Sequence, residues 1–236
     1  MATGESRIPG NVEAILLDAG GVLLDLDYGY LRRLIEAKHP ALGDQDLPRA
    51  EAMARREINR TVLAGARISE SWRDYFRILL GVVEVPADSY ESIIDSLWSA
   101  HCQVGLWTAV AEGALEAVAA LKQMGFRLGV VSNAEGQIER DLTGAGFVGV
   151  FETVIDSHVV GVEKPDPAIF EIALERMKLD RKTTIFVGDL PSVDVEGARA
   201  AGLRAVLLDR HDVYTDVDVP RLRSLAELPA LLRPED

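Results

Sequence analysis

The sequence contains a single cysteine, Cys102, so no disulfide can form within the chain. This is compatible with a reducing compartment, and we expect a cytoplasmic protein. No apolar run approaches the roughly 20 residues that a membrane-spanning helix needs. The opening residues, MATGESRIPG, also lack the apolar stretch of a signal peptide. These features exclude a disulfide-stapled fold and predict a chain with no membrane span.

Positive charge is scarce as well. The 25 Lys and Arg residues are outnumbered by 38 Asp and Glu residues, which gives a formal net charge of -13. An acidic surface repels nucleic-acid phosphates and anionic lipids, so we expect neither nucleic acid nor a membrane as the main partner. It also repels anionic substrates, so any phosphate site needs local positive charge. The sequence gives no indication of oligomeric state.

What the chain does contain is a regular alternation of short apolar runs and helical patterns. The 236 residues, 48% of them hydrophobic, are enough for one large α/β domain or for a core with a smaller insertion. The expected strands are 14–17, 127–131, 153–155, 184–187 and 205–208, and the expected helices are 111–124, 166–178 and 196–201. Strands that alternate with helices predict a doubly wound, Rossmann-like parallel sheet.

One long segment departs from this alternation. Residues from about 28 to 107 have a helical pattern, are rich in Arg and Glu, and contain no convincing strand. We therefore predict a core domain made of residues 1–27 and 108–236, with an all-helical domain of residues 28–107 inserted between its two parts.

Polar residues stand at the carboxyl ends of three of the expected strands: Asp18, Ser132 and Asp189. In open α/β sheets the ligand crevice lies just outside these strand ends. The pattern alone therefore predicts that the three side chains converge on one site.

Four segments follow one another along the chain: AILLDAGGVLLD, LGVVSNAEG, GVEKPDPAIF and TIFVGDLPSVDVEGARAAG. In this order and spacing they resemble the haloacid dehalogenase superfamily, in the branch that inserts a helical cap soon after the first motif. The resemblance covers nearly the whole chain, from about residue 12 to residue 208. It implies a hydrolase, and the phosphatase branch in particular, acting on a small phosphorylated metabolite such as a sugar phosphate.

The resemblance also implies a nucleophile and a metal site. Asp18 stands in the position of the family's nucleophile, which attacks phosphorus and forms an aspartyl-phosphate that water then hydrolyses. Mg²⁺ would be held by the carboxylates of Asp18 and Asp189 and by the backbone carbonyl of Gly20. Asp194 would bind the ion through water or orient Asp189.

The phosphate-binding groups are implied in the same way. Lys164 would neutralise Asp18 and the phosphate, a task that suits its compact point charge. The hydroxyl of Ser132, together with backbone N–H groups near Asn133 and Ala19, would hold the phosphate oxygens.

The chain departs from the family at Gly20, where most of its phosphatases carry an aspartate that protonates the leaving group. Such a general acid typically contributes about 10²–10⁴-fold in rate. Three explanations are open. The substrate has a good leaving group, such as an acyl phosphate or a sugar 1-phosphate; Asp25, Asp27 or a cap residue supplies the proton; or the chain is a catalytically weak or inactive relative that kept only the binding site. The family that the chain resembles includes a subset with the same glycine, and this subset contains working sugar-phosphate phosphatases. We therefore favour an active enzyme.

The family also contains 2-haloacid dehalogenases, which use the same aspartate on carbon and need no metal. Dehalogenases usually lack the aspartate found here at position 189 and usually carry a bulky aromatic in place of Gly20, so we favour phosphoryl chemistry. Within the cap we interpret the remaining polar and aromatic candidates as solvated or packing residues rather than substrate contacts. They are Arg55, Arg56, Arg67, Trp72, Arg73, Trp98, His101 and Cys102.

Overall fold

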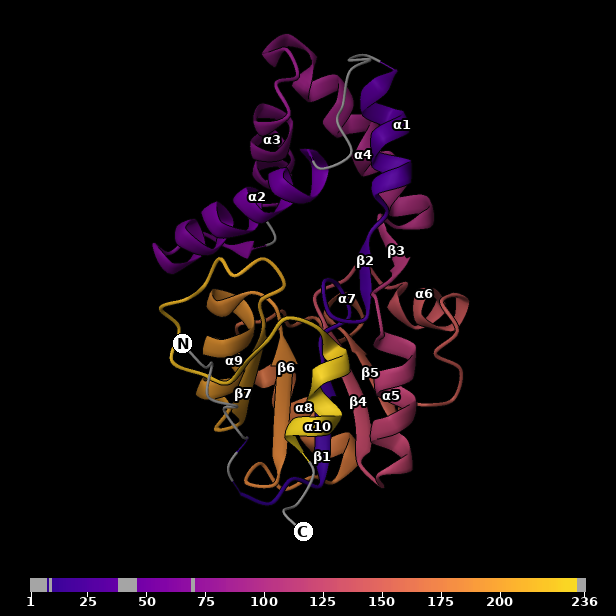
Figure 1. Ribbon diagram of the computed structural model, residues 1–236, viewed down its shortest axis with the longest axis vertical. Helices are drawn as coiled ribbons and strands as arrows, with labels where there is room; N and C mark the ends of the chain where they lie inside the picture. The colour runs from indigo at the N-terminus through magenta and orange to yellow at the C-terminus, as the bar shows by residue number, and fades with distance from the viewer. Residues whose placement is uncertain (1–7, 9, 38–45, 69–70, 233–236) are drawn as a thin grey trace. The chain divides into compact units, whose positions relative to one another are not determined.

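The computed structural model describes residues 8, 10–37, 46–68 and 71–232. The chain divides into two compact units, shown in Figure 1. The core unit comprises Met1–Asp25 and Ala109–Asp236, and the helical unit comprises Leu26–Thr108. Among the described helices, none is long and apolar enough to span a membrane.

The core unit is built on a six-stranded sheet in the order β5-β4-β1-β6-β7-β8, with every neighbouring pair parallel. The strands are β1 (Ala14–Leu17), β4 (Arg127–Ser132), β5 (Thr153–Asp156), β6 (Thr184–Gly188), β7 (Arg204–Leu208) and β8 (Arg221–Leu222). This arrangement confirms the predicted doubly wound α/β fold, and all five expected strands are present.

The strand order places a topological switch at β1. From β1 the chain passes to β4 and outward to β5, then returns to pair β6 with the other side of β1 and continues outward to β7 and β8. Ligands of open parallel sheets bind outside the carboxyl ends of the strands at such a switch. By this rule the expected ligand site lies beyond Leu17, where β1 ends.

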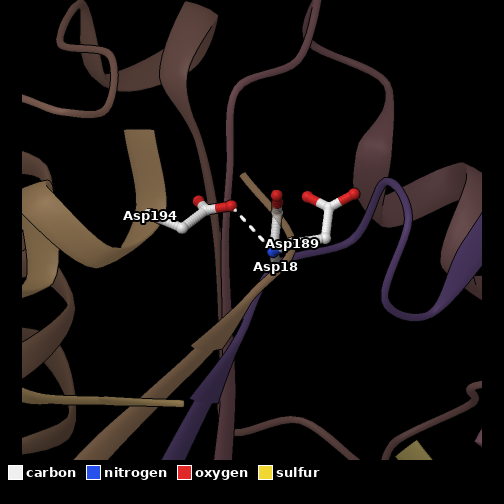
Figure 2. A group of neighbouring side chains, drawn as sticks. All are labelled: Asp18, Asp189 and Asp194. Carbon is white, nitrogen blue, oxygen red and sulfur yellow. Dashed lines mark hydrogen bonds between the residues drawn. The ribbon is translucent and has the colours of Figure 1, made fainter. Parts of the chain in front are cut away.

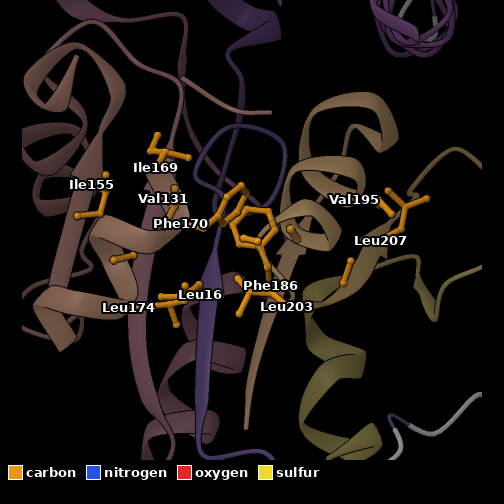
Figure 3. Close-up of a cluster of buried hydrophobic side chains, with 14 of the residues drawn as sticks. Leu16, Val131, Ile155, Ile169, Phe170, Leu174, Phe186, Val195, Leu203 and Leu207 are labelled. Carbon is orange, nitrogen blue, oxygen red and sulfur yellow. The ribbon is translucent and has the colours of Figure 1, made fainter. Parts of the chain in front are cut away.

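Helices cover both faces of this sheet. They are α5 (Ala114–Gln123), α6 (Ile138–Gly144), α7 (Ser157–Val160), α8 (Ala168–Met177), α9 (Glu196–Ala200) and α10 (Leu228–Leu231), with the shorter turns η3 (Pro191–Val195) and η4 (Leu225–Glu227). Figure 3 shows one apolar layer, in which Phe170 of α8 packs edge-on against Phe186 of β6. Alternate strand residues such as Ile15 and Leu17 are also fully buried, so the opposite face is covered too.

The helical unit has an apolar core of its own. Its helices are α1 (Tyr28–Glu36), α2 (Asp46–Leu63), α3 (Trp72–Val82) and α4 (Tyr90–Val104), with the short turn η2 (Ala87–Ser89) before α4. Leu31, Phe76 and Leu97 are fully buried in this core. Helical periodicity in the sequence anticipates these helices. That this unit closes over a substrate stays a prediction.

Several short elements were not predicted from the sequence. Strands β2 (Leu24–Leu26) and β3 (Trp107–Val110) form a separate two-stranded sheet. The edge strand β8 has only two residues. Stretches this short carry too little hydrophobic periodicity to be distinguished from a loop.

Candidate active site

Three aspartates meet at the switch point of the sheet. Asp18 directly follows β1 and Asp189 directly follows the neighbouring strand β6, while Asp194 lies in the π-helical turn η3. One carboxylate oxygen from each lies within 4.8 Å of the others, and all three residues are buried. Figure 2 shows them together beyond the strand ends. Parallel pairing of β1 with β6 brings together residues that are far apart in the sequence.

Lys164 supplies positive charge to this cluster. Its side chain is only 1% exposed, and its Nζ lies 2.9 Å from Oδ2 of Asp18 and 2.8 Å from Oδ1 of Asp194. The same ammonium lies over the ring of Phe186, 5.2 Å from the centroid. A buried ammonium needs such partners, because leaving it unpaired would cost several kcal/mol.

Asp194 acts through both of its oxygens. While Oδ1 accepts from Lys164, Oδ2 accepts from the backbone N–H groups of Asp189 and Leu190, each at 2.9 Å. The carboxylate therefore orients the turn that carries Asp189. Gly188 permits this close approach, since a Cβ on it would lie 2.3 Å from Cβ of Asp194. Position 188 consequently has no room for any side chain.

The end of β4 and the residue after it contribute two of the predicted phosphate-binding residues. Ser132 is the last residue of β4, which pairs with β1, and it is 3% exposed. Asn133 follows it, and its side chain binds the backbone of Lys164 twice. Its Oδ1 accepts from the Lys164 N–H at 2.8 Å and its Nδ2 donates to the Lys164 carbonyl at 3.0 Å. Sequence reasoning considered only the backbone N–H near Asn133 and did not anticipate this link.

The buried charges shift one another's pKa values. Burial raises the pKa of the Asp18 carboxyl above its ordinary value of 3.8, and the adjacent Lys164 ammonium opposes that rise. Burial acts to lower the pKa of Lys164, but the carboxylates of Asp18 and Asp194 outweigh it, and the net shift is upward. Lys164 is therefore cationic at neutral pH and provides the local positive charge that an anion requires in this acidic chain.

Gly20 stands where the general acid is missing, and the structure shows the conformation of the backbone at this position. Gly20 forms an isolated parallel bridge with Leu24, and the positive φ of this turn, 76°, belongs to Gly21. The N–H of Ala19, predicted to lie near the phosphate, donates to Oδ1 of Asp18 at 2.7 Å. Position 20 itself is not in the left-handed region, so a residue with a side chain can adopt its backbone conformation.

The two aspartates considered as alternative acids both have partners. Asp25 forms an ion pair with Arg210, whose Nη1 lies 2.5 Å from its Oδ2. Asp27 is the N-cap of α1 and accepts from the N–H of Tyr30 at 2.8 Å. Their geometry is that of an ion-paired residue and a helix cap.

The candidate residues of the helical unit are held mainly by neighbours within that unit. Arg55 pairs with the buried Glu51 at 2.9 Å, and Arg73 pairs with Glu91 and Asp95 at 2.6 and 2.8 Å. Trp72 packs against Trp98 and His101 in an aromatic cluster, whereas Arg56, Arg67 and Cys102 are exposed. The exposed Arg56 and Arg67 and the packed Trp72 agree with this interpretation, whereas the exposure of Cys102 does not agree with a packing role.

Comparison with known proteins supports the same family. Haloacid dehalogenase-like hydrolase domain-containing protein 3 of Mus musculus is 33% identical over 165 residues, which are 68% of this chain and 65% of that protein. The phosphoserine phosphatase of Thermus thermophilus is 39% identical over 94 residues, 39% of this chain and 38% of that one. The aligned parts thus span less than two thirds of these relatives' own lengths.

Solved structures agree at the level of the fold. A hydrolase of this class from Bacillus subtilis, solved with bound magnesium, has a TM-score of 0.68 at 20% identity and covers 95% of this chain and 100% of that one. Structures of 2-haloacid dehalogenases are similar as well. The family model described as haloacid dehalogenase-like hydrolase matches residues 12–202. The predicted family is therefore confirmed, and the chain belongs to the haloacid dehalogenase-like hydrolases.

Proposed function

We propose that this hydrolase is a Mg²⁺-dependent phosphatase that cleaves a small phosphorylated metabolite, with a sugar phosphate as one candidate. The observation that carries the proposal is the cluster of Asp18, Asp189 and Asp194 at the switch point, with Lys164 bridging two of its members. It combines a buried nucleophile, acidic oxygen ligands and a fixed cation. Metal-assisted hydrolysis of a phosphate ester through an aspartyl-phosphate uses all three.

The donor set fits a hard divalent cation. Three carboxylates and one ammonium are clustered in a buried site, and Mg²⁺ prefers oxygen ligands of this kind. Asp18, Asp189 and the carbonyl of Gly20 would hold the ion, with Asp194 orienting Asp189. The bound ion supplies charge neutralisation between two anionic reactants.

The residues of the chain can carry the reaction in two steps. A carboxylate oxygen of Asp18 attacks phosphorus, the bond from phosphorus to the leaving oxygen breaks, and an aspartyl-phosphate forms. Water then attacks that phosphorus, which releases phosphate and restores Asp18. Lys164 balances negative charge in both steps, while the Ser132 hydroxyl and nearby backbone N–H groups hold the phosphate oxygens.

The curated relatives favour phosphoryl chemistry. Several are named as phosphatases, for phosphoserine, glyceraldehyde 3-phosphate and phosphoglycolate. Their substrates are small phosphorylated metabolites. A screen of phosphorylated metabolites with Mg²⁺ tests the proposal directly. No turnover of any of them, with phosphate still bound, would favour the second candidate, a non-catalytic binding protein.

Removing one acidic ligand should weaken metal binding. We expect Asp189→Asn to lower Mg²⁺ affinity by at least about tenfold, because an amide oxygen carries no net charge to attract the ion. Calorimetric titration of the wild type and the variant measures the difference. Asp180→Asn is the matched control, since Asp180 is exposed in the turn before β6. Equal affinity of the wild type and Asp189→Asn would remove Asp189 from the metal site.

The glycine at position 20 predicts a steep dependence on the leaving group. Without a general acid, a simple alkoxide cannot depart easily, so aryl and acyl phosphates should react much faster than alkyl phosphates. We expect Gly20→Asp to narrow that gap, by up to about 10²-fold if the new carboxyl reaches the leaving oxygen. Rates measured across a series of phosphate esters give the slope for each protein.

Two controls make this experiment decisive. Gly144→Asp adds a carboxylate at an exposed glycine in α6 where a Cβ meets no neighbouring atom, and it should leave the slope unchanged. Circular dichroism and Mg²⁺ titration establish that Gly20→Asp is folded and keeps its metal site. A flat series in the wild type, with chemistry rate-limiting, would mean that another residue already donates the proton.

A further inference from the structure

A fourth buried aspartate stands at the same edge of the sheet, outside the acidic cluster. Asp156 is the last residue of β5, is 6% exposed, and pairs in register with Ser132 of β4. Its Oδ2 accepts from the N–H groups of Gly136 at 2.9 Å and Ile138 at 3.4 Å, and its Oδ1 accepts from that of His158 at 3.0 Å. In the described part of the chain, all its partners are backbone N–H groups.

The next residue acts on the same segment. The hydroxyl of Ser157 accepts from the N–H of Ala134 at 3.1 Å and lies 3.2 Å from the carbonyl of that residue, to which it donates. Asp156 and Ser157 therefore hold Ala134, Gly136 and Ile138, all within the segment 133–138 that follows Ser132. On its other side, this segment is tied to Lys164 through the side chain of Asn133.

These bonds have a chemical consequence for anion binding. The N–H groups of Ala134, Gly136 and Ile138 donate to Ser157 and Asp156, so they are not directed at a phosphate. What the bonds achieve is to fix the backbone beside Ser132 to a strand of the sheet. Groups that bind a substrate gain affinity when a rigid element holds them in place before it arrives.

We propose that Asp156 and Ser157 are positioning residues, which hold the segment 133–138 so that Ser132 and the backbone at Asn133 can bind phosphate. The proposal rests on the proposed phosphatase function. Asp156 also caps the four-residue helix α7, and a role confined to that cap would affect stability without affecting phosphate binding. The carboxylate divides its oxygens between the two tasks, Oδ1 to the helix and Oδ2 to the segment.

The experiment compares Asp156→Ala, Asp156→Asn, Ser157→Ala and Ser157→Thr with the wild type. Inorganic phosphate is the probe, measured as the Ki for inhibition of p-nitrophenyl phosphate hydrolysis, alongside kcat, KM and the Mg²⁺ activation constant. Hydrogen exchange of the segment 133–138 reports whether the segment is released. Asp180→Ala is the matched control, because Asp180 also accepts from a backbone N–H, that of Lys182 at 2.8 Å, in the turn before β6.

We expect Asp156→Ala to raise the Ki for phosphate and the KM by about tenfold or more, with faster exchange in the segment and an unchanged Mg²⁺ activation constant. Ser157→Ala should act in the same direction, and Ser157→Thr should restore binding because it keeps the hydroxyl. Asp156→Asn keeps one oxygen acceptor, so it should fall between the wild type and Asp156→Ala. If Asp156→Ala does not fold, the serine pair and the asparagine variant decide the question.

Two results would overturn the proposal. Faster exchange with an unchanged Ki would show that release of the segment does not affect phosphate, and unchanged exchange would show that the two side chains do not hold it. A wild type that neither hydrolyses p-nitrophenyl phosphate nor binds phosphate would refute the phosphatase function and, with it, the positioning role. In that case the exchange measurement still shows whether the two side chains hold the segment.

Discussion

Asp18→Asn is expected to abolish phosphatase turnover while leaving the protein folded. The carboxylate of Asp18 is the group proposed to attack phosphorus, and an amide is a far poorer nucleophile. Loss of a nucleophile lowers kcat by at least about 10⁴-fold. The change is nearly isosteric, and Oδ1 of asparagine can still accept from the N–H of Ala19, as it does in the wild type at 2.7 Å. The substitution removes the ion pair between Asp18 and Lys164, but Lys164 still forms its ion pair with Asp194.

The measurement is the release of phosphate from p-nitrophenyl phosphate and from any metabolite found active, at saturating Mg²⁺. Asp180→Asn is the matched control, since it makes the same chemical change in an exposed turn, and it should retain wild-type kcat. Trapping of an acid-stable phosphorylated protein in the wild type and not in Asp18→Asn would identify the intermediate. Activity of Asp18→Asn near that of the wild type, after contaminating phosphatase has been excluded, would place the nucleophile elsewhere.

The second large effect is expected for Lys164→Met, and it falls on stability as well as on activity. Methionine fills a similar volume but leaves the carboxylates of Asp18 and Asp194 buried without their cation. Breaking a buried ion pair by removing one partner costs about 3–5 kcal/mol. We therefore expect the free energy of unfolding in metal-free buffer to fall by that amount. Lys182→Met, at an exposed position, should change it by no more than about 0.5 kcal/mol.

The sign of the pH dependence follows from the carboxylates. Burial raises the pKa of Asp18 above 3.8, and loss of the ammonium removes the group that lowers this pKa most. A carboxyl whose pKa is raised by folding costs no stability below its unfolded pKa and costs progressively more as pH rises toward its folded pKa. The deficit of Lys164→Met should therefore be small in acid and full at neutral pH. Urea unfolding at both pH values measures it.

Magnesium provides an independent check on the same variant. A divalent cation among Asp18, Asp189 and Asp194 would replace part of the charge lost with Lys164, so adding Mg²⁺ should narrow the stability gap between variant and wild type. If Mg²⁺ changes the stability of neither protein, that result would argue against binding of the ion at this cluster. A gap that is already absent in metal-free buffer at neutral pH would contradict the buried ion pairs themselves.

The sequence was most informative where a buried strand ends in a charged residue. The apolar runs before Asp18 and Asp189 predicted β1 and β6, and parallel pairing then required the two carboxylates to be neighbours. Even the weak candidate at 153–155 proved to be β5. These predictions succeed because each strand can be recognised from its own apolar run. The carboxyl ends of parallel strands then lie at the same edge of the sheet.

Hydrogen bonds between a side chain and the backbone of a residue far away in the sequence could not be predicted from local patterns. The link from Asn133 to the backbone of Lys164 spans 31 residues, and no local pattern specifies which backbone an amide will bind. Asp156 was missed for a different reason. It stands directly after the run 153–155, so the strand-end rule applied to Asp18 and Asp189 would have found it. Its role still required the hydrogen bonds.

The central position of β1 has a consequence for how the chain is made. Ala14 pairs with Arg127 on one side and with Thr184 on the other, so the strand emerges from the ribosome long before either partner exists. Its fully buried AILL sequence remains without a partner strand until residues 127–132 have been synthesised. Pairings at such separation close slowly and expose apolar surface meanwhile. During synthesis, the segment that leads to the nucleophile is therefore among the first to need protection from aggregation and among the last to be completed.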